Sequence, residues 1–372
     1  MELLYDYGPS LLPQGPMTGG MWRYRDLLPL GEGEILYPLP VGGTPLLAPP
    51  VLRRETGLEY LFLKDETRGP TGSNKDRATA LVLEHALRTG ASTVTCASMG
   101  NVATSLAVGA AAAGLQAVVF VPVGVNPAKL RLMLLAGAKV LKVREGYEAA
   151  FRLSRAAARE YGWIDRNTGV NPMTLEGKKT VAYEIWEQLG RRMPDAVVAP
   201  VGDGPTLSAL AKGFREIVEC GGAQSVPRII GVQAEGCQPL KLAFERGGIP
   251  EHAEPDTIAD GIAVGAPVSA ASVLRDVRES GGAFVAVPDA QFLAAIKRLA
   301  QGAGILAEPA GAAAFAGTLA ALSQGLLEPT QTVVALVTGS GLKTPEYLRP
   351  AGRAHTVSDQ LAEVEGALGL PT

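Results

Sequence analysis

One lysine lies in a segment whose neighbours suit covalent chemistry. Lys75 follows the turn-forming residues 70–74, and a strand-like apolar run precedes this turn while a helix-like run follows it. Ligands of α/β sheets bind at such strand-to-helix junctions. A neutral lysine amine can form a Schiff base with a carbonyl group. We therefore predict that Lys75 holds a carbonyl cofactor; a solvated lysine in an ordinary loop is the alternative that this segment alone leaves open.

A second strand-end turn has the composition of an anion cup. It consists of Gly202, Asp203, Gly204, Pro205 and Thr206, followed by an apolar helical run. The glycines let main-chain N–H groups approach an anion, and the helix adds its positive N-terminal end. The spacing matches neither a dinucleotide-binding fingerprint nor a nucleoside-triphosphate loop. The turn predicts a phosphate site in which the Asp203 carboxylate points away or meets a cation; a tight turn with Thr206 as helix cap is the alternative.

Two further turns at strand ends carry hydroxyl and amide groups. Ser98, Met99, Gly100 and Asn101 form the first, and they offer donors for a carboxylate without any arginine. Thr338 opens the second, where its hydroxyl can meet a ring nitrogen. A capped helix start and a plain turn are the alternatives. Together the four turns fit one ligand with an aldehyde, a phosphate and a ring nitrogen, which is pyridoxal phosphate.

The elements that must position these turns alternate along the chain. Helical spacing predicts one short helix in the irregular arm 1–50, and residues 247–269 lack periodicity and predict a long loop. Strands followed by helices predict mainly parallel sheets in an α/β, doubly wound fold. We expect strands at 60–64, 93–96, 117–121, 139–143, 196–201, 228–233 and 332–337, and helices at 22–27, 78–87, 104–113, 127–135, 147–161, 177–189, 206–219, 290–302, 311–325 and from about 353.

Composition excludes several classes of partner. A net charge of −3 gives no reason to expect nucleic acid or a membrane surface. The three cysteines, Cys96, Cys220 and Cys237, are scattered and have no histidine at ligand spacing, so we expect reduced thiols and no metal site. Neither a signal peptide nor an apolar run of about 18 residues is present. A cytoplasmic protein acting on a small molecule is the expectation.

The order of the motifs resembles the fold type II family of pyridoxal-phosphate enzymes, which includes the β subunit of tryptophan synthase. Within it the chain looks most like threonine synthase. The resemblance covers about residues 20–350. The matching segments are Trp22–Pro29, Gly42–Leu46, Thr71–Arg77, Ala97–Asn101, Asn171–Thr180, Glu308–Ala310 and Thr338–Lys343.

The resemblance implies an architecture and a set of roles. It implies a large cofactor domain from 1–77 and 167–352, a small mobile βαβ domain from 78–166, a tail at 353–372, and a homodimer. Lys75 would carry the cofactor and later move protons at the substrate carbons. Asn101 would bond the ring hydroxyl, residues 202–206 the phosphate, and residues 98–101 the α-carboxylate of the substrate. Thr338 would face the ring nitrogen and leave it largely unprotonated, which tempers its action as an electron sink.

The resemblance also implies a reaction: elimination or replacement at the β or γ carbon of a small amino acid, with phosphohomoserine giving threonine and phosphate. The residues that usually bind the substrate phosphate are replaced, because Thr174 and Gly169 stand where an arginine and a serine are common. These changes favour a threonine or serine dehydratase or a diaminopropionate-type ammonia-lyase as the alternative. A non-catalytic binding protein is a remote one.

Three cations near these positions can compensate for the missing arginine if their side chains reach the site. They are Arg166, Lys178 and Lys179. For the two lysines, a solvated helix start is an equally good interpretation.

Overall fold

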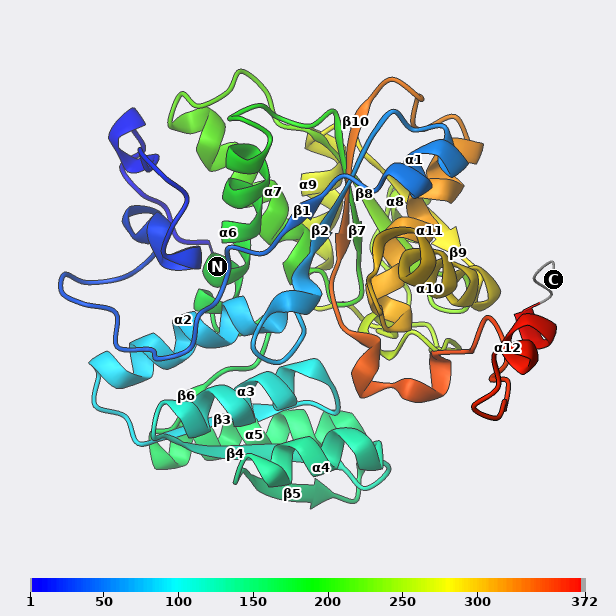
Figure 1. Cartoon of the computed structure of the whole chain (residues 1–372). Helices are drawn as coiled ribbons and strands as arrows, with labels where there is room; N and C mark the ends of the chain where they lie inside the picture. Colours follow the sequence, from blue (N-terminus) through cyan, green and yellow to red (C-terminus); the bar gives the residue numbers. More distant parts are fainter. Residues whose placement is uncertain (1, 369–372) are drawn as a thin grey trace.

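The larger of two sheets has six strands in the order β1-β2-β10-β7-β8-β9 (Figure 1). The computed structural model describes residues 2–368. All neighbouring strands pair in parallel except β1 and β2, which are antiparallel. The strands are β1 (Leu46–Leu47), β2 (Tyr60–Asp65), β7 (Ala196–Pro200), β8 (Arg228–Ala234), β9 (Ala283–Val287) and β10 (Thr332–Val337).

Helices cover both faces of this sheet because its strands are apolar on both sides. In β10, Val333 and Ala335 belong to the core beneath α10 and α11, whereas Val334 and Leu336 belong to the core beneath α6 and α7. This alternation is the doubly wound arrangement that was predicted. The covering helices are α6 (Met173–Gln188), α7 (Pro205–Glu219), α8 (Pro239–Arg246) and α9 (Ala270–Glu279) on one face, and α1 (Pro50–Thr56), α10 (Asp289–Ala303) and α11 (Pro309–Ser323) on the other.

The smaller sheet has four parallel strands in the order β5-β4-β3-β6. Val119 of β4 packs with α3 and α4, while its neighbour Phe120 packs with α5, so this sheet is covered on both faces too. The elements are β3 (Thr93–Ala97), α3 (Asn101–Ala112), β4 (Gln116–Pro122), α4 (Pro127–Leu135), β5 (Lys139–Val143), α5 (Gly146–Tyr161) and β6 (Ile164–Asp165).

Helix α2 (Lys75–Arg88) lies between the two sheets, as its cyan ribbon in Figure 1 shows. It packs against α3 on one side and against α6 on the other. The contact with α6 is close enough to require glycine, because a Cβ at Gly177 would lie 2.3 Å from the carbonyl oxygen of Arg77. The first turn of α2, which begins at Lys75, is therefore held directly against α6.

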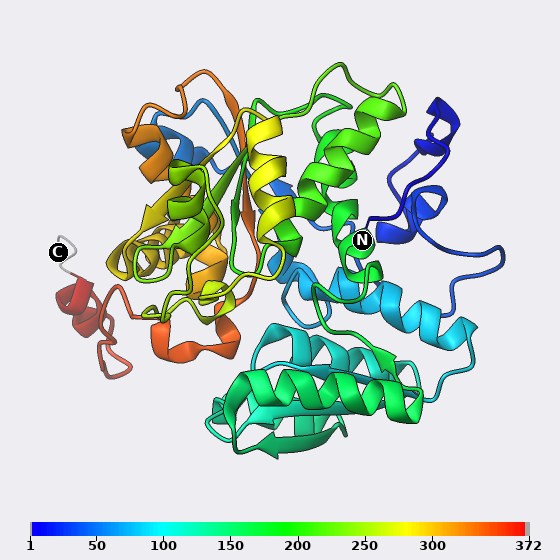
Figure 2. The same ribbon diagram turned by 180° about the vertical axis from the view of Figure 1, so that it is seen from behind.

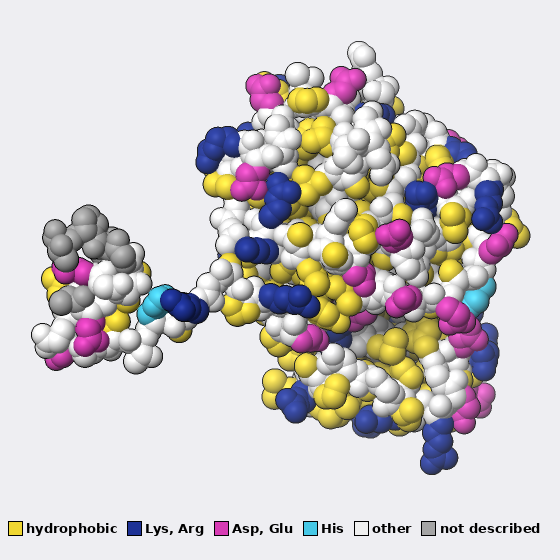
Figure 3. All heavy atoms as spheres, turned by 90° about the vertical axis from the view of Figure 1, so that its right-hand side faces the viewer, with side chains coloured by type: hydrophobic (Ala, Val, Ile, Leu, Met, Phe, Trp, Pro, Cys, Tyr) yellow, Lys and Arg dark blue, Asp and Glu magenta, His cyan; other side chains and the backbone are white. Residues whose placement is uncertain are grey.

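The N-terminal arm runs beside α6 and α7, as seen from behind in Figure 2, and the C-terminal segment with α12 (Leu361–Leu368) stands off from the body in Figure 3. Within residues 2–368, no helix is both long and apolar enough to cross a bilayer. The 3₁₀ segments are η1 (Pro9–Leu11), η2 (Gly20–Leu27), η3 (Glu66–Arg68), η4 (Asp260–Ile262), η5 (Gly341–Lys343) and η6 (Pro345–Tyr347).

Most of the expected elements are present, and several short ones were missed. The sequence did not predict β1, β6, α1, α8, α9 or β9, and the expected loop 247–269 contains η4. Helix α6 begins at Met173 rather than 177, because the Asn171 side chain accepts a hydrogen bond from the Met173 N–H at 3.0 Å. The helix expected from about residue 353 begins at Leu361. The part of this expectation that concerns residues 369–372 lies outside the described residues.

Candidate functional site

The four turns singled out in the sequence all follow the carboxyl ends of parallel strands. Three of them follow β2, β10 and β7, which are adjacent in the larger sheet, and the fourth follows β3 of the smaller sheet. The Asn74 N–H donates to the Thr338 carbonyl at 2.9 Å, and Ser340 N–H donates to the Gly72 carbonyl at 2.8 Å. These main-chain bonds fix the lysine turn against the Thr338 turn.

Lys75 is the first residue of α2 and is half-buried at this junction. Its Nζ donates to Asn74 Oδ1 at 2.9 Å. Burial lowers the pKa of Lys75 to about 8; Glu308 opposes the shift, and the positive charges of Arg166 and Lys343 add to it. At pH 7 about one-tenth of this amine is therefore neutral, far more than for a lysine of ordinary pKa, and the neutral form is the one that attacks an aldehyde.

The cup formed by residues 202–206 is closely packed against its surroundings at both glycines. A Cβ at Gly202 would lie 2.9 Å from Ile262 Cα, and Gly204 has φ 106° with its Cβ position 2.3 Å from a Val273 methyl. Helix α7 begins at Pro205 directly behind the cup. Thr206 Oγ1 accepts a hydrogen bond from Asn74 Nδ2 at 3.4 Å, so the cup lies next to the residue that precedes Lys75.

Asp203 directs its carboxylate to a neighbouring loop. Its Oδ1 accepts a hydrogen bond from the Val268 N–H at 2.9 Å, and burial raises its pKa while the charge of Lys178 opposes the rise. Its Oδ2 is 3.5 Å from the position that a Cβ on Gly169 would take. Both expectations for Asp203 are thus met in part: a main-chain donor holds one oxygen, and a cation lies nearby.

Asn101 and Glu308 meet between the two sheets. Asn101 Nδ2 donates to Glu308 Oε1 at 2.6 Å, and burial raises the pKa of Glu308. Within the described part of the chain, the buried atoms Asn101 Oδ1 and Glu308 Oε2 have no hydrogen-bond partner. Gly339 leaves room for this pair, since a Cβ there would lie 2.2 Å from Glu308 Oε1. Two unsatisfied polar atoms at one point indicate that a ligand group is expected there.

The other predicted residues lie around the same point. Thr338 is buried and its hydroxyl donates to the Ala310 carbonyl at 3.4 Å. In the loop before α3, Gly100 N–H donates to Ser98 Oγ at 3.2 Å, and the Met99 side chain is exposed. The turns after β2, β10 and β7 therefore converge with Asn101, whereas Met99 points outward.

Arg166 and Lys178 are buried cations without an acidic partner in the part of the chain that the structure describes. Arg166 donates to Thr79 Oγ1 at 3.1 Å, to Thr168 Oγ1 at 2.8 Å and to the Lys75 carbonyl at 3.4 Å, all neutral acceptors. Lys178 is 3% exposed and makes neither an ion pair nor a hydrogen bond with the residues that the structure describes. Burial, followed by the charges of Lys75 and Arg166, holds its pKa well below the usual range.

Lys179 does not take part in this site. It forms ion pairs with Glu176 at 2.6 Å and Glu216 at 2.9 Å, and its Nζ lies 4.2 Å above the Tyr5 ring. The prediction that Lys179 can compensate for the missing arginine is therefore wrong. The solvated helix start is also wrong for both lysines, because α6 begins five residues before Lys178 and both side chains are buried.

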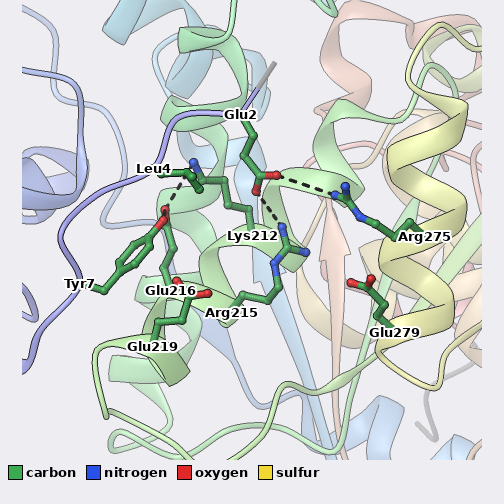
Figure 4. A pocket seen from close by; sticks show the side chains of 9 residues that line it. All are labelled: Glu2, Leu4, Tyr7, Lys212, Arg215, Glu216, Glu219, Arg275 and Glu279. Atoms are coloured by element: carbon green, nitrogen blue, oxygen red, sulfur yellow. Dashed lines mark hydrogen bonds and ion pairs between the residues drawn. The ribbon is translucent and has the colours of Figure 1, made fainter.

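A separate cavity of about 260 Å³ lies beneath the N-terminal arm (Figure 4). Its charges are largely satisfied by one another, since Glu2 pairs with Arg215 at 2.8 Å and Tyr7 donates to Glu216 at 3.0 Å. None of the four strand-end turns contributes to its lining, so this cavity is not the candidate site. The lining residues are Glu2, Leu4, Tyr7, Lys212, Arg215, Glu216, Glu219, Arg275 and Glu279.

The converging groups fit pyridoxal phosphate. The lowered pKa of Lys75 suits an aldehyde, and the glycine cup before α7 suits a phosphate. The unpartnered Asn101 Oδ1 and the Thr338 hydroxyl supply polar contacts for a ring. Sequence reasoning missed Glu308 as a site residue. Its motif, Glu308–Ala310, had been noted, but only the structure places its carboxyl on Asn101.

Comparisons with known proteins agree with this geometry. The sequence profile of the family described as pyridoxal-phosphate dependent enzyme matches residues 37–339. The threonine synthase of Methanosarcina acetivorans is 37% identical over 365 residues, which cover 96% of this chain and 89% of that protein. The threonine synthase of Methanocaldococcus jannaschii is 38% identical, with coverages of 93% and 87%.

Solved structures show the same fold. The L-serine ammonia-lyase from Rhizomucor miehei superposes with a TM-score of 0.70 at 26% identity, covering 82% of this chain and 97% of that one. The threonine deaminase isoform 2 from Solanum lycopersicum superposes with a TM-score of 0.70 at 24% identity, covering 83% and 88%. With a family profile across most of its length and relatives of 37% to 38% identity, the chain belongs to the pyridoxal-phosphate-dependent enzymes and, among them, to the threonine synthases.

Proposed function

We propose that this enzyme converts phosphohomoserine and water to threonine and phosphate at the site around Lys75. The observation that carries the proposal is the pair of buried cations, Arg166 and Lys178, which have no acidic partner within residues 2–368. A buried charge is costly unless it is paired or neutralised. A second dianion, in addition to the cofactor phosphate, would balance both cations.

The leaving group separates this proposal from its alternative. A dehydratase removes a hydroxyl group that is uncharged on the substrate and departs as water once it is protonated, which would leave Arg166 and Lys178 unbalanced. A phosphate can accept charge-assisted hydrogen bonds from a guanidinium and an ammonium at once. Lys178 also lies four residues after Thr174, which places the two on one face of α6. The Lys178 ammonium, one helical turn further along α6, can thus bind the leaving phosphate in place of a guanidinium at position 174.

The remaining residues take the roles that their chemistry allows. When bound, pyridoxal phosphate withdraws electrons from the amino-acid carbons so that their protons become acidic. Lys75 would hold the cofactor and move protons at the α and neighbouring carbons of the substrate. Residues 202–206 would hold the cofactor phosphate, with Asn101 at the ring hydroxyl and Thr338 at the ring nitrogen. Residues 98–101 would bind the α-carboxylate and so orient the carbon chain.

The overall change balances without a further reactant. The bond between Cγ and the phosphate oxygen breaks, and the phosphate leaves with the electron pair. The hydroxyl from water forms a bond to Cβ, and the remaining proton of that water goes to the departing phosphate. Cγ gains one proton and Cβ loses one. We assign these proton transfers to Lys75, because a pKa of about 8 lets it both give and take protons.

A product assay with matched variants tests the proposal. Phosphate, ammonia and 2-oxo acid are measured with phosphohomoserine, L-threonine and L-serine as substrates. We expect phosphate from phosphohomoserine, and Lys178→Met should raise KM about 10- to 100-fold, the range expected for losing a hydrogen bond to a charged group. Lys178→Arg, which keeps the charge, is the control and should recover part of that loss.

Two other outcomes point elsewhere. Release of 2-oxo acid and ammonia from threonine or serine, with no phosphate from phosphohomoserine, would replace the proposal by an ammonia-lyase. No turnover of any substrate by cofactor-loaded protein would favour the non-catalytic alternative.

We also propose the domain division and the assembly that the resemblance implies. Residues 78–166 would move as a unit over the body formed by 1–77 and 167–352, and comparing free and ligand-bound structures tests this movement. A homodimer in the cytoplasm is the proposed state, and light scattering measures its mass.

A further inference from the structure

The turn that presents Lys75 is bound by a lysine from the far end of the chain. Lys343 is the last residue of η5, which follows the Thr338 turn, and its side chain is half-buried. Its Nζ donates to the carbonyl oxygens of Thr71 at 2.9 Å and of Gly72 at 3.0 Å. One ammonium therefore joins two successive carbonyls of the lysine turn.

The conformation of Gly72 accounts for this arrangement. Its φ of 67° lies in the left-handed region that favours glycine, and in this conformation the carbonyls of residues 71 and 72 both face Lys343. The Gly72 carbonyl also accepts a hydrogen bond from the Ser340 N–H at 2.8 Å. Main-chain bonds thus set the position of the turn, and the Lys343 side chain binds the carbonyl before the bonded one as well.

The Lys343 ammonium forms no ion pair within residues 2–368, although acidic groups lie near it. Burial lowers its pKa, and the charges of three carboxylates oppose this shift. Each of these carboxylates accepts a hydrogen bond from another side chain. The acceptors and their donors are Asp76 with Thr71, Glu308 with Asn101, and Asp260 with Lys129 of α4. Both hydrogen bonds of Lys343 therefore go to the main chain of the lysine turn.

We propose that Lys343 is a positioning residue for Lys75: by binding the carbonyls of Thr71 and Gly72, it holds the turn in the shape from which the Lys75 amine reaches the cofactor aldehyde. The inference rests on the proposed role of Lys75 as the residue that holds the cofactor. Hydrogen bonds from an ammonium are stronger than neutral ones, so their loss should let the turn adopt other shapes. The cup at 202–206, which would bind the cofactor phosphate, should be unaffected.

Two ligands that differ only at the reactive carbon test this role on the cofactor-free protein. They are pyridoxal phosphate and its 4′-deoxy analogue, which has a methyl group in place of the aldehyde; quenching of tryptophan fluorescence reports binding. We expect Lys343→Met to raise Kd for pyridoxal phosphate about 10- to 100-fold and to change Kd for the analogue less than about twofold. Lys297→Met, a change at an exposed lysine of α10, is the control and should change neither value.

Two conservative variants give an independent measure of the same role. Lys343→Arg keeps the charge and the donors and should recover part of the loss. Lys343→Gln keeps a neutral donor and should lie between the wild type and Lys343→Met, and it replaces Lys343→Met as the test variant should the latter not fold. An equal loss for both ligands, an unchanged Kd for pyridoxal phosphate, or no recovery by arginine would overturn the proposal.

The proposed function fails in a different way. Mass spectrometry after borohydride reduction of the wild type locates the cofactor, and attachment away from Lys75 would overturn the role of Lys75 and this inference with it. Attachment to Lys75 with an unchanged Kd in Lys343→Met would overturn the inference alone. Neither ligand is an amino acid, so these results do not depend on whether phosphohomoserine is the substrate.

Discussion

Lys178 and Lys179 are neighbours in α6, both are buried, and their surroundings are opposite. Lys179 faces two glutamates and the ring of Tyr5. Lys178 faces Lys75 and Arg166, with Asp203 as the acidic group that opposes them. One residue along a helix turns a side chain by about 100°, which here moves it from a neutralised cluster to an uncompensated one.

The presence or absence of acidic partners for buried lysines distinguishes the clusters that stabilise the fold from the candidate ligand site. The cluster of Glu176, Lys179, Lys212 and Glu216 contains two positive and two negative side chains joined by ion pairs of 2.6 to 3.4 Å. A second cluster pairs Arg77 with Glu66 and Glu184, and Lys64 with Glu184. In the site, by contrast, Arg166 and Lys178 are buried without an acidic hydrogen-bond partner among the described residues. Buried charges that balance one another support structure, and those that do not indicate function.

The largest expected effect is on the site side of the comparison. Lys75→Ala should lower kcat by at least about 10⁴-fold and abolish covalent attachment of the cofactor after borohydride reduction, while the melting temperature of the cofactor-free protein changes little. Mass spectrometry of the reduced protein and a steady-state assay measure these effects. Attachment to a different lysine would remove Lys75 from the centre of the site.

The next effect contrasts the two neighbours directly. Lys179→Met leaves buried glutamates without their cation and should lower the free energy of unfolding by about 3 to 5 kcal/mol. Lys178→Met removes an unpaired buried charge and should leave the free energy of unfolding unchanged or higher. Urea denaturation of both cofactor-free variants measures the difference, and equal losses would erase the distinction between the clusters.

A smaller effect is expected at the edge of the balanced cluster. Tyr5→Phe removes the hydroxyl that donates to Glu176 at 2.8 Å. The loss of this hydrogen bond to a charged group should cost about 1 to 3 kcal/mol of unfolding free energy and leave KM unchanged. A changed KM would mean that the N-terminal arm also acts on the site.

The free energy of unfolding should depend on pH in the way that the lowered pKa of Lys75 requires. Its folded pKa of about 8 lies below the ordinary 10.5, so the unfolded chain binds more protons between these values. The free energy of unfolding of the cofactor-free protein should rise with pH from about 8 to about 10.5. Below pH 8, where Lys75 is protonated in both states, this residue should contribute no further pH dependence. Denaturation curves of wild type and Lys75→Met across that window should diverge; parallel curves would contradict the lowered pKa.

Local patterns were sufficient to predict most of the fold and the four turns of the candidate site. Each predicted turn follows a buried apolar strand, and such strands are readable from composition and spacing. The missed elements are ones that local patterns mark weakly: β1 has two residues, and α9 follows a segment rich in proline and glycine. Their positions depend on packing against the sheet.

The charges of the site were less predictable because they depend on contacts between distant residues. Lys129 and Asp260 are separated by 131 positions, and Asn101 and Glu308 by 207. No spacing rule joins such pairs. The different roles of Lys178 and Lys179 had a local signal, since four residues separate Lys178 from Thr174, but using it required the correct start of α6.

At Gly177 the residue that helix propensity favours, alanine, should be tolerated less well than glycine. In an isolated helix, alanine in place of glycine would be favourable by about 1 kcal/mol. Here the added methyl would meet the Arg77 carbonyl oxygen at 2.3 Å, two residues from Lys75. Related sequences should therefore retain glycine at position 177. In a random library selected for activity, variants with any other residue at this position should be depleted early.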